Sequence, residues 1–204
     1  MKKALAVLAA STLLLSSTIM TEAENIFSRP FDTVHGTVPF SKIDDSQWMP
    51  AIDAGIAAAR QEIDAITKNR ARPDFDNTIV PLEQAGEDLD RVLNIFYPLL
   101  SANATDAMMQ TAMEASAKLS DYSTSIVLDE QLWKRVEEVY NNRDMFDLSP
   151  EESMLLQKTY DSFALSGATL KGADRERYRE LSSELSALTT TFGQNVLKEM
   201  NTYE

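Results

Sequence analysis

The chain has 204 residues, with 19 lysines and arginines against 32 aspartates and glutamates, so its net charge near neutral pH is −13. This acidity argues against a nucleic-acid partner, whose phosphates require a basic surface, and against binding to anionic membranes. Cysteine is absent and His35 is the single histidine. The chain therefore cannot contain the His-Glu-x-x-His zinc motif, which needs two histidines one helical turn apart.

The first residues have the pattern of a secretory signal peptide. Lys2 and Lys3 precede a mostly apolar run at 4–15, and small and polar residues lead to a cleavage site after Ala23. The run is too short for a helix across a bilayer, which needs roughly 20 residues. We therefore expect 1–23 to be removed on export, most simply to the periplasm, and we expect no membrane anchor. The mature part then holds 17 basic and 31 acidic residues, a net charge of −14.

Residues 24–43 form a segment without helical period. They are rich in proline, phenylalanine, threonine and glycine, a composition typical of irregular chain. We expect an extended arm laid over the helices that follow, with Phe27, Phe31 and Phe40 as its anchors.

Residues 44–204 carry apolar residues at helical spacing almost throughout, which predicts one all-α domain of about six helices. The first helix begins after a cap at Asp44, Asp45 or Ser46 and is broken by 69–73. Its apolar stripe consists of Trp48, Ile52, Ile56, Ala59, Ile63 and Ile66.

The second predicted helix spans 76–101 without interruption. Asp76 or Asn77 can cap it, and Pro81 falls early enough for its missing amide to cost little. Gly86 lies on the apolar stripe, which suggests the close approach of a neighbouring helix. The stripe consists of Ile79, Leu82, Gly86, Leu89, Leu93, Phe96 and Leu100.

Three further helices have clear start signals. Thr105 or Asp106 opens the third, Asp129 opens the fourth, and the fifth begins with the capping box Ser-Pro-Glu-Glu at 149–152. Their apolar stripes comprise Met108, Ala112, Ala115, Leu119, Tyr122 and Ile126 in the third helix, Leu132, Trp133, Val136 and Tyr140 in the fourth, and Leu156, Tyr160 and Phe163 in the fifth.

The sixth helix begins near Ala173 or Asp174, and no stop signal follows its last apolar residue before Glu204. This pattern predicts a domain truncated inside a helix whose apolar face packs against residues encoded further on. The stripe consists of Tyr178, Leu181, Leu185, Leu188, Phe192, Val196 and Met200.

No residue pattern in the chain predicts a catalytic centre. His35 is a lone loop histidine, whereas zinc sites require three or four ligands. Glu87, Asp88 and Asp90 could contact a hard cation, but a helix spreads them around its circumference, which favours a solvated face. No serine or threonine has an activating partner. We therefore assign no catalytic, metal-binding or substrate-binding residue and expect the chain to be inactive alone.

Several segments, in order, carry a resemblance to one family. They are Val-Pro-Phe-Ser-Lys-Ile at 38–43, Glu-Ile-Asp-Ala-Ile at 62–66, Phe-Asp-Asn-Thr-Ile-Val at 75–80, Leu-Asp-Arg-Val at 89–92, Leu-Leu-Ser-Ala-Asn at 99–103, Lys-Thr-Tyr-Asp-Ser-Phe at 158–163 and Leu-Thr-Thr-Thr-Phe-Gly-Gln-Asn-Val-Leu at 188–197. Together they resemble the N-terminal region of bacterial peptidyl-dipeptidases (dipeptidyl carboxypeptidases), members of the thimet oligopeptidase family of zinc metallopeptidases.

The resemblance implies a multi-helix N-terminal lobe that forms one wall of a deep channel open to short peptides. It places the zinc ligands and the catalytic glutamate of the full-length parent in its C-terminal half, so zinc and peptides are expected there rather than in this chain. The expected partner is then the chain's own missing C-terminal half.

A second interpretation remains open, in which the chain is a stand-alone exported helical module for peptide binding or protein interaction, derived from that family. The uncapped sixth helix favours the peptidase interpretation. The reading frame after Glu204 distinguishes the two: a continuing frame with a His-Glu-x-x-His motif decides for the enzyme.

Overall fold

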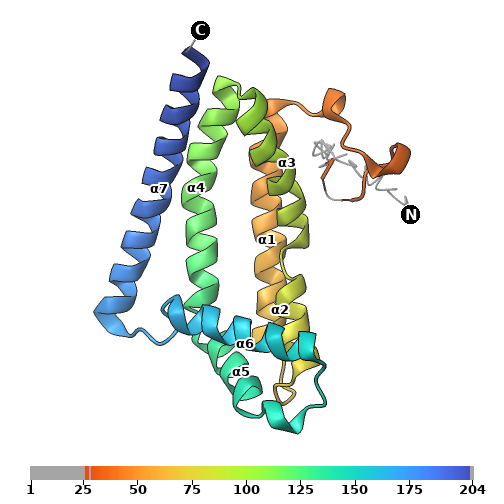
Figure 1. Ribbon diagram of the computed structural model, residues 1–204, viewed down its shortest axis with the longest axis vertical. Coiled ribbons are helices and arrows are strands. Elements are labelled where there is room, and N and C mark those ends of the chain that lie inside the picture. The colour runs from red at the N-terminus through yellow and green to blue at the C-terminus, as the bar shows by residue number, and fades with distance from the viewer. Residues whose placement is uncertain (1–25, 28, 203–204) are drawn as a thin grey trace, which may run out of the picture.

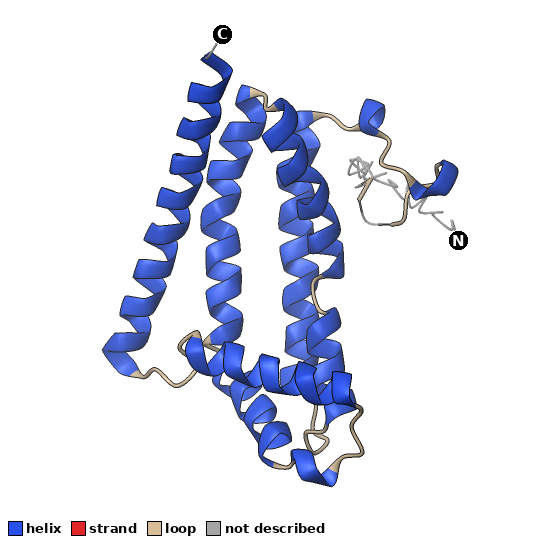
Figure 2. Ribbon diagram, viewed as in Figure 1, coloured by secondary structure: helices blue, strands red, loops and turns tan. Residues whose placement is uncertain are grey.

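The computed structural model describes Ile26, Phe27 and residues 29–202, and the predicted signal peptide lies outside this range (Figure 1). Within the described residues the regular structure is helical and contains no strand, which confirms the all-α prediction (Figure 2). None of the helices described has both the length and the apolar character that crossing a membrane would require.

Seven α-helices lie in the described part of the chain. They are α1 (Trp48–Thr67), α2 (Val80–Gln84), α3 (Glu87–Asn103), α4 (Asp106–Val127), α5 (Glu130–Asn141), α6 (Pro150–Leu165) and α7 (Gly172–Thr202). Short helical turns add Val34–Gly36, Phe40–Lys42, Asp45–Gln47, a π-helical turn at Phe75–Ile79, and Arg143–Met145.

The long helices α1, α3, α4 and α7 run along the long axis of the molecule, and α5 and α6 lie across one end (Figure 1). Helix α1 packs on both α3 and α4, and α4 packs on α7. Helix α7 therefore forms one edge of the bundle, with α4 as its principal neighbour.

The predicted caps fix most helix starts. Asp44 forms a capping box with Gln47, and Ser149 forms one with Glu152 at the start of α6. The Thr105 hydroxyl accepts the Met108 amide at the start of α4. At the start of α5, the Asp129 carboxylate accepts two backbone amides. Each cap satisfies an amide that the first helical turn leaves without a partner, so these boundaries are readable from sequence.

The largest core cluster lies between α1, α3 and α4 and includes one residue of the arm. Phe27 is buried with its ring centroid 5.1 Å from that of Trp48, which in turn lies 5.3 Å from Phe96. Phe31 meets Phe27 edge-on at 6.2 Å. Two of the three expected anchors are therefore in place. Phe40 is not one, because it lies on a short helical turn with 56 % of its surface exposed.

The second predicted helix is interrupted, so its prediction as one element over 76–101 was wrong. It consists of the π-helical turn, α2 and α3, with a break at Ala85 and Gly86. Gly86 adopts φ 93°, a left-handed conformation that favours glycine. An added Cβ there would lie 3.5 Å from the Tyr122 hydroxyl, an ordinary contact. Gly86 is thus required for its backbone conformation rather than for close helix packing.

The cap of this segment is also displaced from its expected position. Asp74, rather than Asp76 or Asn77, accepts the amide of Asn77, and the Asn77 side chain accepts the amide of Asp74 in return. The cap therefore lies two residues before Asp76 and three before Asn77, and the π-helical turn begins at Phe75.

The close helix approach that the sequence predicted at Gly86 is found at Gly55 instead. A Cβ on Gly55 of α1 would lie only 2.9 Å from the Leu89 Cα of α3, closer than side chains tolerate. The missing side chain lets α1 and α3 pack backbone to backbone. Gly55 sits one position before Ile56 and beside the predicted stripe, so its role was not evident from spacing.

Candidate functional site

The described residues contain no group of three or more histidine, aspartate or glutamate side chains that could hold a metal ion. His35 is exposed in a turn at φ 61°. Glu87, Asp88 and Asp90 are exposed in the first turn of α3, where Asp88 pairs with Arg91 at 2.9 Å. These carboxylates lie at the positive end of the α3 dipole, in agreement with the predicted solvated face.

Two tyrosines have a raised pKa. Burial raises the pKa of Tyr97 above its ordinary value. Burial also raises the pKa of Tyr122, with further contributions from the carboxylates of Glu62 and Asp90. Both phenols therefore stay protonated at neutral pH and are poor candidates for a general base.

The most unusual surface of the molecule belongs to α7, which turns its polar side toward the bundle. The Ser186 and Ser116 hydroxyls lie 2.7 Å apart, and the Thr190 hydroxyl donates to Ser116 Oγ at 3.0 Å. The Gln194 side chain donates to the Met109 carbonyl of α4 at 2.7 Å. Small and polar groups thus form the contact between α4 and α7, which we call the polar seam.

The apolar stripe of α7 faces away from α4, on the side opposite the polar seam, and we call it the outer face of α7. Its side chains are between 42 % and 71 % exposed. No charged residue occurs from 185 to 197, although a quarter of all residues in the chain are charged. The outer face consists of Leu181, Leu185, Leu188, Phe192, Val196 and Met200.

This arrangement reverses the usual amphipathic helix, which buries its apolar side. A soluble monomer rarely leaves a continuous apolar strip exposed, and such strips mark interaction surfaces. The predicted stripe is confirmed as a surface that lies outside the core of this chain. The polar seam was not evident from sequence, because serines and threonines on a helix do not reveal which neighbour they contact.

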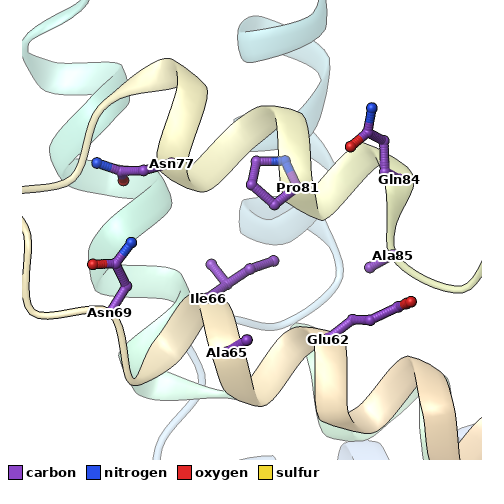
Figure 3. A pocket seen from close by; sticks show the side chains of 8 residues that line it. All are labelled: Glu62, Ala65, Ile66, Asn69, Asn77, Pro81, Gln84 and Ala85. Atoms are coloured by element: carbon purple, nitrogen blue, oxygen red, sulfur yellow. The ribbon is translucent and has the colours of Figure 1, made fainter.

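A cleft of about 360 Å³ lies between α1 and α2 (Figure 3). Its polar side chains are largely engaged in holding the fold. The Glu62 carboxylate accepts the amide of Gly86 at 2.8 Å and so stabilises the start of α3 from a different helix. The cleft is lined by Glu62, Ala65, Ile66, Asn69, Asn77, Pro81, Gln84 and Ala85.

Next to this cleft, Arg135 of α5 is a buried cation, 7 % exposed, that holds the connection between α1 and the π-helical turn. It donates to the carbonyl of Asn69 at 2.9 Å and to Asn77 Oδ1 at 2.7 Å. It also donates to the Ala71 carbonyl and the Thr78 hydroxyl. Every one of these acceptors is neutral, which makes Arg135 a structural clamp.

Sequence reasoning missed Arg135, because arginines are seldom buried. The signal was its spacing, three residues after Leu132 and four before Val139, which are both buried on α5.

No family model matches the chain. The chain is 35 % identical over 169 residues to the dipeptidyl carboxypeptidase of Escherichia coli (strain K12), a match that covers 80 % of this chain and 25 % of that protein. It is 35 % identical over 158 residues to the dipeptidyl carboxypeptidase of Salmonella typhimurium, covering 78 % of the chain and 23 % of the relative. Oligopeptidase A of Haemophilus influenzae is 27 % identical over 172 residues, a match that covers 83 % of this chain and 25 % of that protein.

The chain thus spans about a quarter of the length of the curated relatives it matches. The names of the two relatives at 35 % identity agree with the family resemblance that the ordered sequence segments carry. The chain is homologous to the N-terminal region of the dipeptidyl carboxypeptidases, in the thimet oligopeptidase family of peptidases.

Proposed function

We propose that this chain is the non-catalytic, channel-wall part of an exported zinc metallopeptidase that releases dipeptides from the C-termini of short peptides. The names of the two relatives at 35 % identity support the reaction class. The pattern of a signal peptide at 1–23 supports export to the periplasm.

The zinc of such an enzyme does not fit the residues of this chain. One histidine, no cysteine and exposed carboxylates supply too few of the ligands that zinc prefers. We therefore assign zinc and the hydrolytic step to the remainder of the peptidase, and to this chain the task of shaping the space that peptides enter.

The observation that carries this proposal is the reversed orientation of α7. Its polar seam attaches it to α4, while its outer face presents an uncharged apolar strip to whatever lies beyond. Burying a leucine or phenylalanine side chain contributes about 1.5–3 kcal/mol, so covering this face with the catalytic remainder would stabilise the assembly strongly.

The rest of the chain is suited to form a channel wall because side-chain contacts restrict its backbone at both ends of the helical bundle. Phe27 and Trp48 fasten the arm to the α1–α3–α4 core at one end. At the other end, the Arg135 clamp fixes the connection that precedes α2. A wall must keep its shape while peptides pass, and both devices restrict the backbone at points where it changes direction.

We expect the chain alone, without 1–23, to bind no stoichiometric zinc and to release no dipeptide from blocked tripeptides. Metal analysis after dialysis and a peptide assay with added zinc test this directly. The E. coli dipeptidyl carboxypeptidase serves as the positive control. Zinc bound at one equivalent, or metal-dependent release of dipeptides, would show that this chain carries the chemistry itself.

A further inference from the structure

A second cleft, separate from the outer face of α7, lies where the end of α1, the corner between α4 and α5, and the start of α7 meet. Its volume is about 520 Å³. Three cations and three carboxylates line it, together with small polar groups. The cations are Lys68, Arg175 and Arg179, and the carboxylates are Asp64, Asp129 and Glu130.

The charges in this cleft do not pair completely. Lys68 pairs with Asp64 at 2.5 Å, and Arg175 pairs with Glu130 at 2.7 Å. The Asp129 carboxylate accepts the backbone amides of Gln131 and Leu132 as the cap of α5.

Arg179 is the charged residue of the cleft to which these interactions give no partner. It makes no hydrogen bond or ion pair within the described part of the chain, and its Nε is buried without an acceptor. A buried guanidinium nitrogen without an acceptor is uncommon, because the group gives up its hydration without a compensating hydrogen bond. The Nε of Arg135 is also buried without an acceptor, but the terminal nitrogens of Arg135 donate to four acceptors, which distinguishes it from Arg179.

A second arginine, Arg175, lies close to Arg179 on α7. Arg175 lies four residues earlier on α7, so both side chains project from the same side of the helix. Arg175 uses one terminal nitrogen for Glu130. Both arginines line the cleft, so a ligand that enters it meets two guanidinium groups one helical turn apart.

A carboxylate is the group that fits this arrangement. Its two oxygens match the planar fork of a guanidinium, and the charge-assisted pair is stronger than a neutral hydrogen bond. An entering carboxylate also meets Asp64, Asp129 and Glu130, but each of these is already compensated by a cation or by backbone amides. The net charge of −13 disfavours polyanions.

We propose that this cleft is a binding site for a carboxylate group, with Arg179 as the primary contact and Arg175 beside it. The carboxylate can come from the C-terminus of a short peptide or from a free organic acid, since the group recognised is the same. This site is distinct from the outer face of α7 and does not depend on the catalytic remainder.

Nitrogen-15 NMR of arginine Nε–H groups tests the site in the chain without 1–23. We expect N-acetyl-dialanine, which has a free carboxylate, to shift the resonances of Arg179 and Arg175 saturably. The C-terminal amide of the same peptide should leave them unmoved. Titration with acetate distinguishes the sources: an equal response identifies a site for any carboxylate, and a response to the peptide alone identifies a peptide site.

Two variants and a matched control complete the experiment, with the Arg175 resonance as the common reporter. Arg179→Gln should weaken the apparent affinity about tenfold or more, because the charged fork is lost. Arg179→Lys, which keeps the charge without the fork, should give an intermediate loss.

The control is Arg177→Gln, since Arg177 is exposed on the same helix and its ion pair within the described residues is with Glu180. It should change the affinity by less than about twofold. Equal shifts with the acid and the amide, no saturable shift, or undiminished affinity in both Arg179 variants would each overturn the assignment.

Discussion

Replacing Phe192 and Val196 together with glutamate is expected to turn a self-associating chain into a monomer while leaving its thermal stability nearly unchanged. Both side chains belong to the outer face of α7, with Phe192 71 % and Val196 42 % exposed. We expect two copies of the isolated chain to associate through this strip despite the net negative charge, because an exposed continuous apolar strip marks an interaction surface. Two glutamates place like charges on the strip, so association would bring these charges together and would bury less apolar surface.

Sedimentation velocity combined with thermal unfolding measures both consequences. The control carries Ala187→Glu and Thr191→Glu, which add the same charge, four residues apart, to exposed positions of α7 that the outer face does not include. We expect the control to associate as the parent chain does. Loss of the folded state in the Phe192 and Val196 variant would instead place these side chains in the core, where each large truncated contact costs about 2–5 kcal/mol.

Substituting Gly55 with alanine is expected to destabilise the fold by about 1–3 kcal/mol, because overpacking forces backbone shifts. The added Cβ would lie 2.9 Å from the Leu89 Cα, a backbone atom that cannot rotate away. Helices α1 and α3 must then separate, which loosens the cluster around Trp48, Phe27 and Phe96.

Gly193→Ala is the matched control, since Gly193 also lies inside a helix but has nothing within 4 Å of the added Cβ. It should be neutral or stabilise the chain by up to about 1 kcal/mol, the helix-propensity gain of alanine over glycine. Urea unfolding at constant protein concentration compares the two. Equal stability of both variants would contradict the backbone-to-backbone contact of α1 with α3.

Much of the fold was predictable because it follows from local rules. The apolar stripe from Trp48 to Ile66 and the capping box at Ser149 depend on neighbouring residues of one helix, where periodicity and cap chemistry leave few alternatives. The cap before the first helix was predicted as one of three residues, of which the structure uses Asp44.

The features that escaped prediction arise from contacts between distant segments. The break at Gly86 is accompanied by a hydrogen bond from its amide to Glu62, 24 residues earlier. The tight contact at Gly55 depends on Leu89, and the burial of Arg135 depends on carbonyls near Asn69. A single helical pattern carries no information about which partner approaches it, so these required the structure.

The candidate site shows the same division. The apolar stripe of α7 was evident from its regular spacing, and its exposure was an expectation that the structure confirms. The polar seam did not, because Ser186, Thr190 and Gln194 acquire their role only from Ser116 and Met109 on α4.

The most direct test of the channel-wall proposal is a chimera. The segment of the E. coli dipeptidyl carboxypeptidase that this chain matches is replaced by the corresponding residues of this chain. The chimera is predicted to bind zinc and to release dipeptides from blocked tripeptides, and to lose that activity when Phe192 and Val196 become glutamate. A folded, zinc-loaded chimera that releases no dipeptide would contradict the proposal and favour the alternative of a stand-alone binding module.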